Sequence, residues 1–123
     1  MISPQQQYLS TQVLTATPGQ LVIIVYDEAI KGLKMAKVAL SRGQVPEVNR
    51  HLQKTQQAVD LLQSSLNYKA GDIAEKLGAL YDFIRDHLVT ANLKKDSRLV
   101  DEALSLLEGL REAWAEIVNR PRA

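Results

Sequence analysis

Four stretches of this chain carry apolar residues at spacings of three and four, the period of an α-helix, and only a few residues separate one stretch from the next. The spacing predicts helices over 18–41, 46–67, 72–94 and 97–119. No segment alternates polar and apolar residues for long enough to predict a strand. Because short connections make consecutive helices antiparallel, the pattern predicts an all-α fold, an up-down-up-down four-helix bundle over residues 17–120.

Each predicted helix has one apolar stripe that we expect to face the core. The stripes are Val22, Tyr26, Ala29, Leu33, Ala36 and Leu40; Val48, Leu52, Thr55, Val59, Leu62 and Leu66; Ile73, Leu77, Leu80, Ile84, Leu88 and Ala91; and Val100, Ala103, Leu107, Leu110, Trp114 and Ile117. Trp114 is assigned to the core because it lies within its stripe. Leu61 and Leu104, beside the stripes, are expected to widen the buried face.

Capping residues mark the predicted helix starts. Thr17 is a candidate N-cap, Pro18 suits the first helical position, and Gln20 stands where a capping box places its partner. Asp72 and Glu75 form a similar Asp-x-x-Glu pair at the start of the third predicted helix.

Composition limits the classes of function. The chain has 123 residues, of which 46% are hydrophobic and 24% charged, as in an ordinary single soluble domain. Its 15 basic and 14 acidic residues are interspersed, so we expect no nucleic-acid partner. The absence of cysteine excludes disulfides and cysteine metal sites. The N-terminus does not have the pattern of a signal peptide, and no apolar run is long enough to span a bilayer. We therefore expect a cytoplasmic protein without membrane insertion.

Residues 1–16 are polar and rich in glutamine, with isolated apolar anchors that include Tyr8, Val13 and Leu14. This composition predicts a flexible N-terminal arm that docks weakly on the rest of the domain.

The first predicted helix begins with an apolar run, residues 21–26, that covers every side of the helix. Its own domain can bury one face, and Ile23 and Ile24 exceed what a bundle core needs. Either the N-terminal arm covers these two residues or a partner does, because large apolar patches are uncommon on monomers. A groove that accepts an amphipathic helix is the expected binding mode.

Catalytic and metal-binding motifs are not indicated. The chain has neither the Glu-x-x-His pairs of di-iron bundles nor a glycine-rich phosphate loop. His51 follows Glu47 by four residues, but two ligands define a metal site poorly, so we interpret them as a surface ion pair. His87 lacks the small and basic neighbours of a phosphotransfer histidine and is interpreted as solvated. We expect no enzymatic activity, metal or cofactor.

The pair Tyr26-Asp27 recurs 55 residues later as Tyr81-Asp82, and several apolar positions recur at the same spacing. A duplicated helical hairpin is one explanation, and two in-phase halves of a bundle are the other. We expect each tyrosine to pack at the edge of the core with its hydroxyl reaching a partner, and each aspartate to face solvent.

One ordered set of residues runs through nearly the whole chain: Tyr8, Val13, Thr15-Ala16-Thr17-Pro18, Leu21-Val22, Tyr26-Asp27, Gly71-Asp72-Ile73-Ala74, Leu80-Tyr81-Asp82-Phe83, Ala91-Asn92 and Leu110-Arg111-Glu112-Ala113-Trp114. With this set the chain resembles the flagellin-specific export chaperones, the FliS family of flagellar biosynthesis. Glu28 departs from the glycine that often follows Tyr-Asp in that family.

The resemblance implies a cytoplasmic helical chaperone that binds the disordered C-terminal segment of flagellin and prevents premature polymerisation. It implies delivery to the flagellar type III export gate, with no nucleotide or metal, and a segment that displaces the chaperone's own N-terminal cap. The expected cap residues are Tyr8, Val13 and Leu14, and the expected groove residues are Ile23, Ile24, Tyr81 and Asn92. The alternatives are a self-associating helical-bundle regulator, which would form a homodimer, and a phosphotransfer-type bundle.

Overall fold

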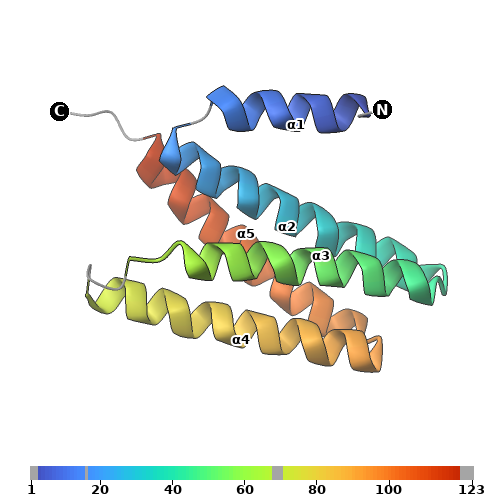
Figure 1. Ribbon diagram of the computed structural model, residues 1–123. Helices are drawn as coiled ribbons and strands as arrows, with labels where there is room; N and C mark the ends of the chain where they lie inside the picture. The colour runs from blue at the N-terminus through green and yellow to red at the C-terminus, as the bar shows by residue number, and fades with distance from the viewer. Residues whose placement is uncertain (1–2, 16, 68–70, 120–123) are drawn as a thin grey trace.

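The structure is a computed structural model that describes residues 3–15, 17–67 and 71–119, with side chains except at residues 10 and 12–15. These residues form five α-helices and no strand, so the predicted all-α class is confirmed. In chain order the helices are α1 (Pro4–Thr15), α2 (Pro18–Ser41), α3 (Val45–Ser64), α4 (Asp72–Lys94) and α5 (Ser97–Val118) (Figure 1).

The first helix, α1, lies where a flexible arm was expected. It starts with a capping box in which the Ser3 backbone N–H donates to Gln6 Oε1 (3.0 Å) and the Gln6 N–H donates to Ser3 Oγ (3.1 Å). The same arrangement opens α2 at Thr17 and Gln20, which confirms the capping box predicted there. The low apolar content that predicted an arm does not prevent a capped helix.

The other four helices form a ring of contacts, in which α2 and α4 each pack against both α3 and α5. Ion pairs show the relative direction of α2 and α5. Asp27 pairs with Arg111, whereas Lys37, further along α2, pairs with Asp101, nearer the start of α5. The two helices are therefore antiparallel. Figure 1 shows α1 outside this ring, drawn above α2, with its C-terminal end towards the start of α2.

Polar contacts between α3 and α4 show that these two helices are also antiparallel. Near the start of α3, Asn49 Oδ1 accepts a hydrogen bond from Lys95 Nζ (2.6 Å), at the end of α4. Further along α3, Asp60 pairs with Arg85 (2.9 Å), in the middle of α4.

The core lies between α2, α3, α4 and α5 and consists mainly of the predicted stripe residues. Its largest fully buried side chains are Tyr26, Tyr81, Leu33, Leu52, Ile84, Leu88, Leu107, Val48, Val59, Val100 and Thr55. Leu104 is also buried and Trp114 packs against the core, as predicted.

Three predicted burials were wrong: Ile73 is 72% exposed, Ile117 58% and Leu61 56%. Ile73 and Ile117 lie at the start of α4 and the end of α5, and Ala74 is the buried residue in that first turn. Leu61 is next to Leu62, which occupies the core position of that turn of α3. A helical stripe sets which side of a helix is apolar, but its width and its ends depend on the neighbouring helices.

The structure differs from the predicted bounds at α3, which covers Val45–Ser64, and at the end of α5, which is Val118, and it also differs in the N-cap residue of α4. Helix α3 ends at Ser64 rather than at residue 67, and the hydroxyls of Ser64 and Ser65 donate to carbonyl oxygens three residues back. The N-cap of α4 is Gly71, with φ of 91°, rather than Asp72. This backbone conformation favours glycine, which explains the residue type at that turn.

Candidate partner-binding site

The two repeated tyrosines meet at the centre of the core. Tyr26 is 0% exposed and Tyr81 is 1% exposed, and their hydroxyl oxygens are 2.5 Å apart. Burial raises the pKa of both phenols above the ordinary value, while the nearby Trp114 side chain acts in the opposite direction. The prediction that each hydroxyl reaches a partner is confirmed, and the partner is the other tyrosine. Tyr81, a predicted groove residue, is therefore inaccessible in this structure.

The two aspartates beside these tyrosines are exposed, as predicted. Asp27 accepts a hydrogen bond from Arg111 Nε (2.9 Å), and Asp82 accepts one from Gln63 Nε2 (2.7 Å). Each aspartate thus joins its helix to a neighbour at the surface.

Ile23 and Ile24 are half-buried but are not among the residues packed against the core, unlike their neighbours Val22 and Val25. The end of α5 covers another side of this part of α2, since a Cβ at Gly19 would lie 3.0 Å from the Val118 side chain. The two isoleucines thus belong to the apolar surplus that the sequence indicated, at the end of α2 from which α1 departs (Figure 1).

The predicted cap residues lie on α1. Tyr8 is 68% exposed, so its side chain is not buried against α2 in this structure. The side chains of Val13 and Leu14 lie outside the described part of the chain.

Asn92 lies far from the two isoleucines. It is in the last turn of α4, where its Oδ1 accepts a hydrogen bond from Lys95 Nζ (2.7 Å), which also binds Asn49. This is the end of the molecule at which α5 begins, whereas Ile23 and Ile24 are near the end of α5. The structure therefore does not bring the four predicted groove residues together.

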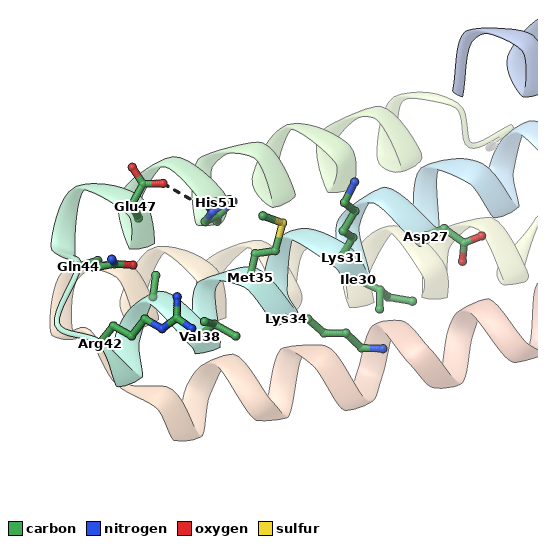
Figure 2. A pocket seen from close by; sticks show the side chains of 11 residues that line it. Asp27, Ile30, Lys31, Lys34, Met35, Val38, Arg42, Gln44, Glu47 and His51 are labelled. Atoms are coloured by element: carbon green, nitrogen blue, oxygen red, sulfur yellow. Dashed lines mark ion pairs between the residues drawn. The ribbon is translucent and has the colours of Figure 1, made fainter. Parts of the chain in front are cut away.

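A surface groove that the sequence analysis did not identify runs along α2 to the start of α3, with a volume of about 650 Å³. We call it the α2–α3 groove. Its apolar lining is Ile30, Met35, Val38 and Ala39, and its basic lining is Lys31, Lys34 and Arg42 (Figure 2). The available signal was the pair Met35 and Val38, two apolar residues among the lysines on the outer side of the helix.

His51 closes the α3 side of this groove, and its predicted exposure was wrong. The residue is 6% exposed, and its Nε2 is 3.9 Å from Glu47 Oε2. Burial lowers the pKa of His51 below its ordinary value of 6.5, with the nearby Arg50 acting in the same direction. Glu47 is engaged more closely by Arg50 than by His51. Among the described residues there is no group of three or more histidine and acidic side chains that could hold a metal ion.

His87 was expected to be solvated, but it lies in a shallow hollow between α4 and α5. Its Nε2 is 2.6 Å from Glu102 Oε2, and its ring stacks on Phe83 with centroids 5.0 Å apart. The histidine thus links the two helices.

None of the helices, over the residues described, combines the length and apolar character needed to cross a membrane.

Sequence comparisons relate this chain to known proteins. Residues 1–121 match the family model described as flagellar protein FliS. A flagellar secretion chaperone FliS from Salmonella typhimurium is 33% identical, over 91% of this chain and 84% of its own length. Relatives with the same name from Bacillus subtilis and Vibrio cholerae are 29% and 30% identical, over 98% and 89% of this chain and 90% and 81% of their own lengths. Because the family match covers almost every residue, this chain belongs to the FliS family of flagellar secretion chaperones.

Proposed function

We propose that this protein is a cytoplasmic export chaperone that binds the disordered C-terminal segment of flagellin, prevents premature polymerisation and delivers flagellin to the type III export gate. The names of its relatives as flagellar secretion chaperones support this proposal. The proposed scaffold is an up-down-up-down bundle of α2 to α5, which the ring of helix contacts supports.

The observation that carries the proposal is the position of Ile23 and Ile24, which pack outside the core at the uncharged start of α2. We propose that the flagellin segment covers these two residues. Burying apolar surface contributes about 25 cal/mol per Å², which is the main driving force available at an uncharged site.

We further propose that α1 is a displaceable cap that competes with flagellin for the start of α2 through Tyr8, Val13 and Leu14. The exposed position of Tyr8 supports a helix that is held loosely. Competition of this kind lowers the apparent affinity, because the cap must leave before the ligand binds.

Asn92 and Ile23 lie at opposite ends of the molecule, so a flagellin segment that contacts both must extend along its length. A disordered segment can do this because it orders only on binding, at the cost of part of the contact energy. Tyr81 supports such a surface from within the core and is not proposed as a contact.

The test is a calorimetric titration of the full chain with the C-terminal segment of flagellin from the same organism. We expect saturable one-to-one binding, weakened about tenfold or more by the double variant Ile23→Ser, Ile24→Ser. The matched control is Leu61→Ser with Leu93→Ser, two residues that are 56% and 81% exposed elsewhere on the surface. No binding by the wild-type protein, or equal loss in both double variants, would contradict the proposal.

Deleting residues 1–14 tests the cap separately. The truncated protein should keep the helical circular dichroism signal of α2 to α5 and bind the flagellin segment more tightly, because α1 no longer competes. Weaker binding would show that α1 is part of the binding site rather than a cap over it.

A further inference from the structure

The α2–α3 groove exposes apolar side chains that no other part of the described chain covers. Met35 is 42% exposed and Val38 is 48% exposed, above the buried Ile30 and Ala39. Met35 lies three residues before Val38 and four before Ala39, and Ile30 lies eight residues before Val38, so the apolar strip runs along the axis of α2. Such a strip has the shape that an amphipathic helix fits.

Positive charge borders this strip. Lys31, Lys34 and Arg42 line the groove, and within the described residues none of the three has an ion-pair partner. Lys37, the remaining lysine of α2, is different because it pairs with Asp101.

The two acidic residues that line the groove are already engaged. Asp27 pairs with Arg111 at 2.9 Å, outside the groove lining, and Glu47 pairs with Arg50. The groove therefore keeps an uncompensated positive charge beside an apolar strip, which favours an anionic partner over a neutral or cationic one.

Helix α1 of the same chain does not match this chemistry, since its sequence PQQQYLSTQVLT has no acidic residue. The start of α2, proposed above as a flagellin contact, also differs from the groove, because residues 18–26 carry no charge. The two surfaces on α2 thus differ in charge.

We propose that the α2–α3 groove docks an acidic amphipathic α-helix of a second protein partner, at a site separate from that of flagellin. Apolar residues of the partner helix contact Met35 and Val38, and its carboxylates pair with Lys31, Lys34 and Arg42. The charged contacts accelerate association and weaken with salt, while the apolar strip slows dissociation.

The test uses a designed helical peptide with a leucine stripe flanked by glutamates, a twin with lysines in place of the glutamates, and fluorescence anisotropy on the full chain. The glutamate peptide should bind, and added salt should weaken the binding. The triple variant Lys31→Glu, Lys34→Glu, Arg42→Glu should weaken it by about tenfold or more. The matched control is Lys54→Glu, Lys76→Glu, Lys94→Glu, which makes the same change in net charge on exposed residues outside the groove.

The apolar strip is tested by Met35→Gln with Val38→Gln. This double variant should also weaken binding of the glutamate peptide, and the remaining binding should keep its salt dependence. Circular dichroism of each variant checks that the helices persist.

Three results would overturn the proposal: equal binding of the lysine twin, equal loss in the triple variant and its control, or displacement of the peptide by the flagellin segment. Light scattering provides a fourth. If the wild type self-associates and the groove variant is monomeric, the occupant is a second copy of this chain. The groove variant should bind the flagellin segment as the wild type does, so failure of this proposal is distinguishable from failure of the flagellin proposal.

Discussion

The α2–α3 hairpin and the α4–α5 hairpin repeat a Tyr-Asp pair 55 residues apart, but their helices pack differently. At Gly32, α2 lies so close to α3 that a Cβ would be 2.4 Å from Thr55 Oγ1. The residue 55 positions after Gly32 is His87 on α4. Its Nε2 is 2.6 Å from Oε2 of Glu102 on α5. The first hairpin also has the more extensive helix contact.

This difference shows how one repeated pattern supports two kinds of helix pair. A glycine allows two backbones to approach closely, whereas the imidazole of His87 occupies space between α4 and α5. Each hairpin keeps the tyrosine of the repeat, Tyr26 on α2 and Tyr81 on α4. The two hydroxyls join the hairpins through a buried hydrogen bond. The repeat is thus preserved where the halves meet and altered where each hairpin packs internally.

The largest expected effect comes from removing the close approach of α2 to α3. Gly32→Leu should lower the free energy of unfolding by about 2–3 kcal/mol, because the new side chain must displace Thr55, which also donates to Ala29 O (3.2 Å). The matched control is Gly109→Leu on α5, where a Cβ meets nothing within 4 Å, and it should gain roughly 0.5–1 kcal/mol from helix propensity. Urea unfolding followed by circular dichroism measures both. Equal effects would show that the close approach does not distinguish the two hairpins.

The next effect concerns the junction of the hairpins. Tyr26→Phe and Tyr81→Phe should each cost about 1–2 kcal/mol of unfolding free energy, because each leaves one buried hydroxyl without this partner. The double variant should cost less than the sum of the two, which a double-mutant cycle measures. Tyr8→Phe is the control, since that residue is 68% exposed and should have no measurable effect. Strict additivity would contradict coupling between the two hairpins.

The smallest effect is the pH dependence of the first hairpin. The pKa of His51 is lowered in the folded state, so the unfolded chain binds more protons below the ordinary value of 6.5. The free energy of unfolding should therefore fall as the pH decreases through this value and level off below the folded pKa. Chemical unfolding at several pH values between about 7.5 and 5 measures this slope, which His51→Gln should reduce. An unchanged slope in the variant would assign the dependence to other groups.

Much of the fold was predictable because its signals are local. The capping box at Thr17 and Gln20 marks the start of α2, as the sequence predicts. The predicted range 72–94 matches α4 at both ends. Each of these depends on residues within one turn of the helix end, so no knowledge of tertiary contacts is needed.

The candidate sites were less predictable, because they depend on which helices meet. Ile23 and Ile24 were identified correctly as apolar surplus. Of the other two predicted groove residues, Asn92 lies at the opposite end of the molecule and Tyr81 is buried in the core. His51 shows the same limit, since a histidine four residues after a glutamate indicates an ion pair and does not reveal that its side chain is buried. The α2–α3 groove escaped detection because its walls come from two helices.

The sequence alone was sufficient to establish the all-α class, the four long helices with most of their bounds, the surplus of apolar residues at the start of α2 and the resemblance to the FliS family. These features are encoded by helical period, caps and residue types within single segments. The meeting of Tyr26 with Tyr81, the close approach at Gly32 and the basic groove beside Met35 required the folded chain. The physical reason is that burial and charge compensation are properties of contacts between helices, and residues distant in the sequence create them only after the helices pack.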